Sequence, residues 1–409
     1  AVELANGMRS EVSHDEMGRP IRLAYLRRGV LEKEIDLIWR FGRVESLSDS
    51  RRPGLESLAY DFAGRVASVH FPEGEMIERQ YDLRSQEISR IFRLNGNTGV
   101  LRNLGFTYDL AGRQIEVHDQ GQLILDRRFE DGRLGRIIHG NGLVRSFEYE
   151  PVMGLLERTD LHEFAGETIV STEMTWSECG GTNYCLVANA RVYGHAGEEL
   201  AGIHAEESYE MGPRLEFLST PEGYGARLES WYSWALAGEV VDRMGHHAFD
   251  VLGNWLGVQN AGASTLRFEY NSERNRLLGS DGQVHHDYAW DESGFMVQYD
   301  EAGLEWDAAG LLTRIGDSIS LEWDGLGRPI SVTTPEGTRE MLFGGTVVGD
   351  ASRQPISLDL GDVQVRFASN ERIYRHEDFR GNVQMVTDDG GRLVKFYTYS
   401  PFGVAETFG

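Results

Sequence analysis

Five aspartates recur in one local context, and paired carboxylates are the groups that glycosidases use for acid–base catalysis. They are Asp61, Asp109, Asp250, Asp307 and Asp324. A glycosidase needs two carboxylates that converge in one cleft, which a repeat does not specify. Each of these aspartates stands three residues before a glycine, where its side chain can bond backbone amides and nucleate a turn. We therefore expect turn-forming aspartates rather than a catalytic pair.

Two histidine pairs, His246–His247 and His285–His286, could supply metal ligands. Neighbouring residues of a strand point to opposite faces, so each pair could offer only one ligand to a site. The sequence contains no Gly-rich phosphate loop, Gly-x-Ser-x-Gly elbow or His-Glu-x-x-His motif. We predict no metal site, no cofactor and no enzymatic activity.

Aromatic residues gather around Trp231 and Trp234, and again at Trp290, Trp306 and Trp323. Such rings could stack on sugars, but we expect them to pack inward against a sheet. The only cysteines are Cys179 and Cys185. Their spacing allows a disulfide around a small loop, which would indicate export, or two free buried thiols. Two cysteines cannot complete a four-ligand zinc site.

The elements that carry these residues form a repeat of an aromatic residue, an acid, two free positions, glycine and arginine. Clear copies are Tyr60-Asp61-Phe62-Ala63-Gly64-Arg65, Tyr108-Asp109-Leu110-Ala111-Gly112-Arg113, Trp323-Asp324-Gly325-Leu326-Gly327-Arg328, Phe249-Asp250-Val251-Leu252-Gly253-Asn254 and Trp306-Asp307-Ala308-Ala309-Gly310. The aromatic residue ends a strand, the aspartate nucleates a turn, and the glycine supplies a positive φ. Apolar residues then follow near alternation, so each unit predicts one β-hairpin.

This signature resembles the YD or Rhs repeat family, which includes Rhs polymorphic toxins, C components of insecticidal Tc toxins, wall-associated proteins and teneurins. The resemblance covers residues 10–150 and 245–403. It implies an all-β fold, in which a long antiparallel strip of hairpins curls into a partial or complete hollow shell. At about 4.8 Å per strand, some 40 strands give a strip of about 190 Å. We expect a partial shell or one tight spiral with an open strip edge.

The C-terminal region adds a second resemblance. His376, Asp378 and Gly381 precede a Val-Thr-Asp segment, as in the late part of this family. Pro401 and Gly403 lie in a Tyr-Ser-Pro-Phe-Gly run similar to the start of the Rhs-associated core, with Ser400 in place of Asp. The family's self-cleavage residues cannot be carried over, because the chain stops at Gly409 before that core is complete.

The resemblance divides the chain into four regions. Residues 1–150 and 246–370 are YD-repeat strips, and 371–409 starts the Rhs-associated core. Residues 151–245 depart from the pattern, as degenerate strands of the same sheet or as a small inserted lobe. The pattern is irregular at 16 to 27 residues, which argues against equal propeller blades.

Composition limits the partners. The chain has 409 residues and a net charge of −25, which disfavours nucleic acids and anionic membranes. No stretch approaches the roughly 18 apolar residues that span a bilayer. Glycine makes up about 12% of the chain against an average near 7%, which is typical of many tight turns. The chain opens at Ala1 without a signal-peptide pattern, which favours a trimmed chain.

These observations predict a non-catalytic shell segment of an exported Rhs-like protein, secreted or at the cell surface. The resemblance implies a C-terminal toxin or other passenger polypeptide as the enclosed partner. Delivery machinery or further copies at the open sheet edge are additional expected partners. The alternative is a cell-surface adhesion or carbohydrate-binding module, which would show an exposed aromatic patch. A repeat-scaffold enzyme would instead need a converging charged cleft.

Overall fold

The computed structural model describes the backbone of residues 2–94, 99–163, 166, 168–176, 285–378, 381–399 and 405–408, together with the strands between 187 and 281. Side chains are described for residues 3–94, 99–163, 166, 168–176, 267–271, 274–281, 285–378 and 381–397. These ranges are the described part of the chain. Cys179, Cys185, Trp231, Trp234, His246 and His247 lie outside the described side chains, so the predictions made for them stay predictions.

The described chain consists of β-strands, with one 3-10 turn at Phe343–Gly345 and no α-helix. Consecutive strands pair antiparallel, β1 to β20 in one sheet and β21 to β40 in another. The first sheet contains β1 Val2–Glu3, β2 Met8–His14, β3 Pro20–Arg27, β4 Val30–Arg40, β5 Arg43–Asp49, β6 Arg52–Tyr60, β7 Val66–His70, β8 Met76–Tyr81, β9 Glu87–Leu94, β10 Gly99–Tyr108, β11 Gln114–Asp119, β12 Gln122–Glu130, β13 Arg133–His139, β14 Leu143–Tyr149, β15 Leu156–Glu163, β16 Thr168–Trp176, β17 Val187–Gly194, β18 His204–Glu210, β19 Arg214–Ser219 and β20 Glu229–Trp231. The second sheet contains β21 Ser233–Trp234, β22 Glu239–Val241, β23 Gly245–Phe249, β24 Trp255–Asn260, β25 Thr265–Asn271, β26 Arg276–Asp281, β27 His286–Trp290, β28 Met296–Tyr299, β29 Ala302–Trp306, β30 Leu312–Ile315, β31 Ile319–Trp323, β32 Pro329–Thr334, β33 Gly337–Leu342, β34 Val347–Asp350, β35 Pro355–Asp359, β36 Val363–Arg366, β37 Arg372–Glu377, β38 Val383–Thr387, β39 Leu393–Tyr399 and β40 Ala405–Phe408.

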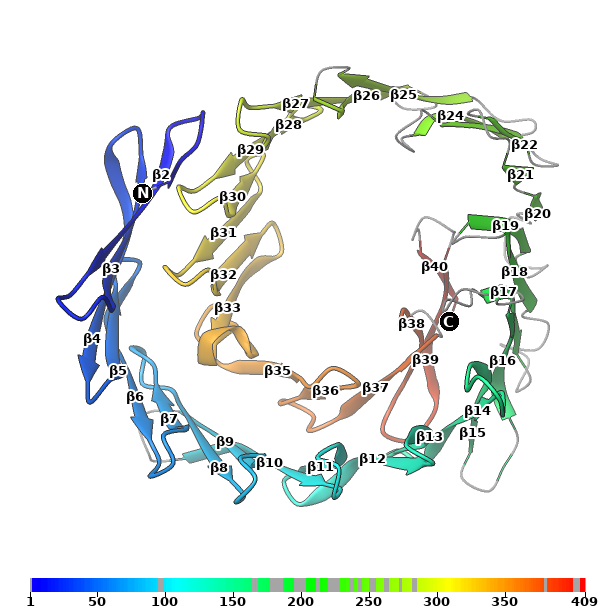
Figure 1. The fold of residues 1–409 in the computed structure, drawn as a ribbon, viewed down its shortest axis with the longest axis horizontal. Helices are drawn as coiled ribbons and strands as arrows, with labels where there is room; N and C mark the ends of the chain where they lie inside the picture. The colour runs from blue at the N-terminus through cyan, green and yellow to red at the C-terminus, as the bar shows by residue number, and fades with distance from the viewer. Residues whose placement is uncertain are drawn as a thin grey trace.

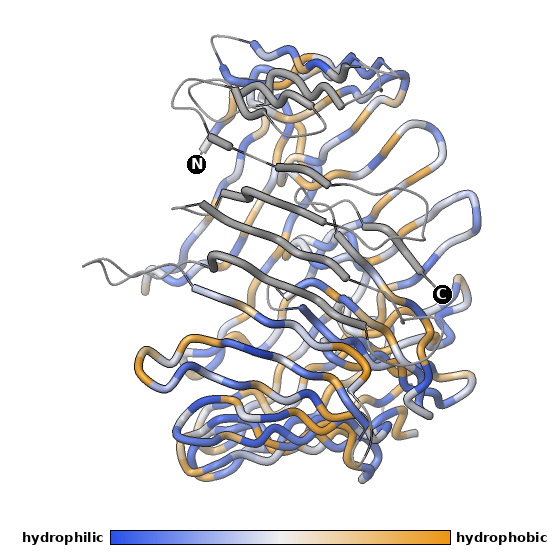
Figure 2. The backbone as a smooth tube through the Cα atoms, turned by 90° about the vertical axis from the view of Figure 1, so that its right-hand side faces the viewer, coloured by the Kyte–Doolittle hydropathy of each residue, from blue (hydrophilic) through white to orange (hydrophobic). Residues whose placement is uncertain are grey.

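Strand alternation gives the strip two different faces. In β4, Lys33 and Ile35 are buried and Glu34 between them is half-buried, whereas Asp36 and Ile38 beyond them are exposed. This period of two is the geometry of a pleated strand, in which successive side chains point to opposite faces. Figure 2 shows the same alternation of hydrophilic and hydrophobic residues along many of the strands.

The strip winds into a spiral. In Figure 1 it runs from the blue N-terminus around the ring and then passes inside its own beginning, so that β28 to β37 lie within β2 to β13. We call β2–β16 the outer turn and β27–β40 the inner turn. The concave face of the outer turn therefore meets the convex face of the inner turn along a common seam.

An apolar core fills the middle of this seam. Phe92 and Leu104 of the outer turn are fully buried against Phe343, Leu358 and other residues of the inner turn. The Phe343 ring meets the Phe92 ring edge-on at a centroid distance of 5.2 Å. Burying large aromatic and aliphatic side chains is the main source of stability in such a layer. The seam is thus the hydrophobic core of the molecule.

Two smaller clusters continue the core along the seam. One joins Val117, Ile124 and Leu125 of the outer turn to Val363 and Tyr374 of the inner turn. The other joins residues of β14–β16 to β38 and β39, and it contains Leu143, Leu161, Val170, Met385 and Phe396. The inner turn is therefore packed against the outer turn as far as β39.

The predicted all-β strip is confirmed, and it forms a partial shell rather than a closed barrel. Among the described pairings, β1 pairs only with β2 and β20 only with β19, whereas β21 pairs only with β22 and β40 only with β39, so each of the two sheets keeps two free strand edges. The four regions that the sequence suggests remain a prediction, because the strand order gives no separate boundary for them.

Candidate functional site: the repeat corners and the seam

The repeat corner is a compact hydrogen-bonded turn, and Asp61 shows its geometry. One carboxylate oxygen of Asp61 accepts hydrogen bonds from the backbone amides of Ala63 and Arg65, both at 2.9 Å. The other accepts one from Arg65 Nε at 2.7 Å. The backbone hydrogen bond from Arg65 lowers the pKa of this carboxyl group. Gly64 completes the corner with a φ of +85°.

The same arrangement recurs along both turns of the spiral. Asp109 accepts from the Arg113 amide at 2.9 Å and Gly112 has a φ of +86°. Asp324 accepts from the Arg328 amide at 2.8 Å and Gly327 has a φ of +81°. Tyr60, Tyr108 and Trp323 end the strands that lead into their corners. Phe249 ends β23, whereas Asp250 and Gly253 lie outside the described residues.

These carboxylates are hydrogen-bonded within their own corners. Each accepts backbone and arginine hydrogen bonds locally, and successive corners stand two strands apart along the rim. Two strand separations are about 9.6 Å, and Asp307 of the inner turn also accepts a hydrogen bond from Lys33 Nζ of the outer turn at 2.8 Å. This geometry is that of a structural turn and not of two carboxylates converging on a bond.

The aromatic residue of each repeat reaches back to the preceding hairpin. Tyr81 donates its hydroxyl hydrogen to the Val66 carbonyl oxygen at 2.9 Å, and Trp323 donates its indole N–H to the Leu312 carbonyl oxygen at 2.7 Å. The same bond is made by other tyrosines and tryptophans at or next to strand ends, namely Trp39, Tyr60, Tyr108, Tyr149, Trp176, Trp290 and Trp306. Sequence reasoning assigned these rings to packing alone and missed this polar role.

The arginine of several outer-turn repeats reaches forward to the next aromatic ring. The Arg65 guanidinium lies over the Tyr81 ring at 4.7 Å from the centroid, and Arg113 lies over Phe129 at 4.0 Å. A cation over a ring face is attracted by the ring quadrupole. Neighbouring repeats are therefore linked twice, by the backward hydrogen bond and by the forward arginine. The regular arginine after each glycine was the sequence signal for this link.

Charged residues are buried where the inner corners meet the outer turn. Lys33 Nζ donates to Asp307 Oδ2 at 2.8 Å and to the Asp324 carbonyl oxygen at 3.0 Å. Asp324 is itself fully buried, and Arg328 beside it donates to Glu56 Oε2 at 2.6 Å. These contacts join residues more than 270 positions apart. The corner aspartates of the inner turn thus serve the seam as well as their own turns.

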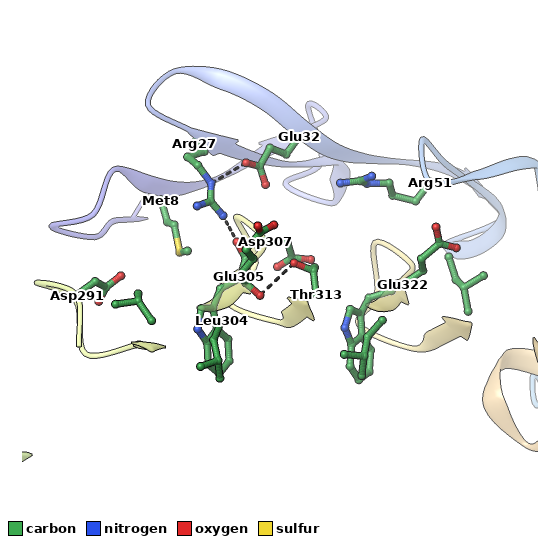
Figure 3. Close-up of a pocket in the computed structure, with 15 residues that line it drawn as sticks. Met8, Arg27, Glu32, Arg51, Asp291, Leu304, Glu305, Asp307, Thr313 and Glu322 are labelled. Carbon is green, nitrogen blue, oxygen red and sulfur yellow. Dashed lines mark hydrogen bonds and ion pairs between the residues drawn. The ribbon is translucent and has the colours of Figure 1, made fainter. Parts of the chain in front are cut away.

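A cavity of about 660 Å³ lies in the seam next to these ion pairs. Figure 3 shows Arg27 and Glu32 extending from the outer strands toward the inner turn, and Glu322 extending toward the outer strands. The cavity walls carry both signs of charge. Neither here nor elsewhere in the described part of the chain do three or more His, Cys, Asp or Glu side chains form a group that could hold a metal ion.

A second buried charge cluster lies further along the seam. Asp119 is fully buried and accepts hydrogen bonds from Arg102 of the outer turn and from Arg372 Nε of the inner turn, the latter at 2.9 Å. A carboxylate shared by two guanidinium groups is compensated despite its burial. Arg102 also donates to Asn370 Oδ1 at 2.7 Å. The cluster fixes the position of β37 relative to β10 and β11.

His376, from the C-terminal motif, lies in the seam against His139. Their ring centroids are 4.5 Å apart, both side chains are buried, and His376 Nε2 lies 2.9 Å from Thr387 Oγ1. Neither ring nitrogen of His139 has a hydrogen-bond partner among the described residues. Burial lowers the pKa of His139 to about 3, and burial also lowers the pKa of His376 well below its usual value. Both rings are therefore neutral at pH 7.

The rest of the C-terminal motif forms another corner. Asp378 Oδ1 accepts from the Asn382 amide at 2.8 Å, and Gly381 has a φ of +83°. Pro401 and Gly403 lie outside the described residues. The described part of the motif therefore resembles the repeat corners in geometry, and Asp378 borders a cavity of about 240 Å³ together with His139, Arg145 and His376.

The second histidine pair is held by separate acids. His285 Nε2 lies 3.1 Å from Asp287 Oδ1, whereas His286 Nδ1 lies 2.7 Å from Asp300 Oδ2. His286 also stacks on the Tyr299 ring at 5.5 Å. The two rings thus have different partners, as expected for neighbours on a strand.

Comparison with known proteins agrees with this fold. Residues 306–339 match the family model described as RHS Repeat, which confirms the resemblance to the Rhs-repeat family. No curated protein sequence matches the chain. The solved structure of TcdB2-TccC3-TEV is similar over 99% of this chain with 13% identity and a TM-score of 0.69, and that of TcdB2-TccC3-Cdc42 over 100% with 13% identity and a TM-score of 0.68. This chain spans about a quarter of those chains, 24% in each case.

Proposed function

We propose that this chain is a non-catalytic segment of a shell that encloses a polypeptide passenger within an exported Rhs-type protein. The main observation behind this proposal is the spiral. Its inner turn lies inside the outer turn and is packed against it through an apolar core and buried ion pairs. A double wall of this kind resists opening, because separating the turns would expose apolar surface and unpaired charges. In the described corners, the repeat carboxylates accept hydrogen bonds from the arginines of the same turns, which supports a structural role for both.

The lining of the inner turn supports an enclosing role. In β31, Glu322 extends toward the outer strands and strand alternation turns Leu321 and Trp323 the other way, and all three residues border the cavity of about 660 Å³. Trp306 and Leu304 occupy the equivalent positions of β29. These side chains are half-buried rather than exposed. A lining of partly covered aromatic and aliphatic groups suits weak, sequence-tolerant contact with an unfolded chain.

The end of the inner turn supports the same proposal. Met385 and Phe396 pack on the concave side of β14–β16, so β38 and β39 run inside the outer wall. A polypeptide joined after β40 would start from the inner turn. Among the similar solved structures, one is titled TcdB2-TccC3-Cdc42 and another TcdB2-TccC3 without hypervariable C-terminal region. Those titles fit a fold whose C-terminal partner can be exchanged.

Location outside the cytoplasm is part of this proposal and rests on the family resemblance. Among the described residues, no helix is long and apolar enough to span a bilayer. The proposed passenger is a toxin or another polypeptide, and delivery machinery is the expected second partner.

A protease-protection experiment tests the container role. An unfolded reporter of about 50 residues, rich in trypsin sites, is joined after Gly409 in one fusion and before Ala1 in a matched fusion. We expect much slower digestion of the reporter joined to the inner turn than of the reporter joined to the outer turn. Equal digestion rates in the two fusions would show that the shell does not enclose a polypeptide joined after Gly409.

A further inference from the structure

Large apolar side chains stand exposed along one rim of the outer turn. Phe62 is 96% exposed and Leu83 is 100% exposed, both at the tips of repeat corners. The row comprises Met17, Phe41, Phe62, Leu83, Leu110, Val152 and Met153, which we call the tip row. Single exposed apolar residues need no explanation, but a contiguous row of them marks an interaction surface.

The strand order places the whole tip row on the same rim. Its members lie in the turns that follow β2, β4, β6, β8, β10 and β14, and alternate turns of an antiparallel strip share one rim. From Met17 to Leu110, successive tips are two strand separations apart, about 9.6 Å, whereas the corner after β12 carries no large apolar residue, so that four strand separations divide Leu110 from Val152. The row therefore follows the curved wall of the outer turn as an arc with one gap.

Corners of the inner turn show the contrasting case of a covered tip. Ala308 and Gly325 occupy the position that follows the corner aspartate, and both are buried under the outer turn. A Cβ atom at Gly325 would overlap Ile35 and approach Asp49 within 3.1 Å. Phe62, Leu83 and Leu110 occupy the same position on the outer turn and are exposed. The two covered tips are small and these three free tips are large, so the tip row is suited to a different contact from the seam.

The charge of the rim also differs from that of the whole chain. The chain carries a net charge of −25, whereas its seven outer corners, 15–19, 40–43, 61–65, 82–86, 109–113, 130–133 and 150–154, contain seven arginines and eight acidic residues. A nearly neutral rim can approach another copy of itself without strong repulsion. The overall charge, in contrast, opposes docking of this rim on an anionic membrane.

We propose that the tip row is the contact surface of a homodimer, in which two copies meet rim to rim about a two-fold axis. An arc turned by 180° about the in-plane axis through its midpoint falls on itself with its direction reversed, so the two rows overlie along their length. The middle tip, Leu83, then lies near its own copy, and Phe62 lies near Leu110 of the other copy. Seven side chains of this size expose on the order of 1,000 Å² on each copy, which exceeds the ~800 Å² per partner of a standard interface.

Rim-to-rim pairing joins two spirals into one longer chamber. Only this consequence depends on the proposed container function, because dimerisation of the chain can be measured without any passenger. A failed protease-protection experiment would contradict the container function but not the dimer. A chain that stays monomeric would contradict the dimer but not the container function.

Sedimentation velocity at protein concentrations up to about 100 µM tests the proposal. We expect a concentration-dependent dimer, and at least about a tenfold weaker dimer for the combined variant Phe62→Ser, Leu83→Ser and Leu110→Ser. The matched control is Val30→Ser with Leu55→Ser. These residues are 67% and 49% exposed and lie away from the tip row, so the control should dimerise like the parent chain. A wild-type monomer at every concentration overturns the proposal, as does a dimer that the tip variant leaves unchanged.

Cross-linking tests the arrangement within the dimer. In a background carrying Cys179→Ser and Cys185→Ser, Leu83→Cys should form an intermolecular disulfide under mild oxidation, and Val30→Cys should not. Co-sedimentation with phosphatidylcholine vesicles addresses the membrane alternative, and we expect no binding. Vesicle binding that the triple serine variant abolishes would overturn the proposal in favour of a lipid surface.

Discussion

Gly64 and Gly112 hold their corners in a backbone conformation that other residues adopt only with strain. Their φ values are +85° and +86°. We predict that Gly64→Val or Gly112→Val lowers the free energy of unfolding by about 1–3 kcal/mol, because a β-branched residue is disfavoured at positive φ. Urea denaturation followed by tryptophan fluorescence measures the change.

Gly303→Ala provides the matched control for the corner glycines. Gly303 lies within β29, has no positive φ, and has no atom within 4 Å of an added Cβ. Its replacement should be within about 0.5 kcal/mol of neutral. Equal costs at Gly303 and Gly64 would contradict the assignment of Gly64 to a strained corner.

The neutral histidines of the seam make its stability depend on pH. Burial holds the pKa of His139 at about 3, whereas an unfolded histidine titrates near 6.5. A lowered histidine pKa contributes stability that is complete above about pH 6.5 and is lost as the pH falls toward 3. Between pH 7 and pH 5, His139 should account for a loss of about 2 kcal/mol in the free energy of unfolding. His376 acts in the same direction, since burial lowers its pKa too.

The variant His139→Leu isolates this effect from the titration of the many carboxylates. Its free energy of unfolding should fall less steeply between pH 7 and pH 5 than that of the parent chain. The control is His285→Leu, because His285 is exposed and lies outside the seam. An unchanged slope in His139→Leu would mean that the seam opens without protonating this ring.

At the scale of the hairpin, the hydroxyl of each repeat tyrosine connects neighbouring units. Tyr81 and Tyr108 donate to the Val66 and Glu87 carbonyl oxygens, each at 2.9 Å. We predict that Tyr81→Phe or Tyr108→Phe costs about 0.5–1.5 kcal/mol, the net value of one hydrogen bond. Tyr25→Phe is the control, since its hydroxyl makes no hydrogen bond within the described residues. Calorimetric melting of the four proteins would detect the difference, and a loss at Tyr25 equal to that at Tyr81 would exclude this account.

Hairpins could be predicted from the sequence because their causes are local. Asp61 and Gly64 define a turn within five residues, and the alternation after it defines the return strand. The repeat also contains both residues of the contact from Arg65 to Tyr81. Predicting that contact, however, requires the register between neighbouring hairpins, which the repeat does not give. Local chemistry thus yields the elements and their order along the strip.

The layering of the spiral could not be predicted in the same way. It depends on the accumulated twist and curvature of many strands, and no local pattern encodes that sum. Lys33 and Asp307 are 274 residues apart, and nothing in either neighbourhood identifies the partner. The length estimate of about 190 Å favoured a partial shell or one tight spiral, and it left open which strands would lie inside the others. Lys33 is one of only two lysines in the chain, but the sequence does not show that it is buried in the seam.

Lys33 is therefore the place to test whether the seam holds the spiral together. Lys33 and Asp307 are 2% and 5% exposed, so Lys33→Met leaves a buried carboxylate without its cation. Removing one partner of a buried pair costs about 3–5 kcal/mol, and we expect that loss together with a larger radius of gyration in solution scattering. Arg40→Met serves as the control, because the Arg40–Glu45 pair is exposed and should contribute less than about 1 kcal/mol. If Lys33→Met unfolds like the parent chain and keeps its dimensions, the buried pair does not fasten the inner turn, and the apolar core alone must do so.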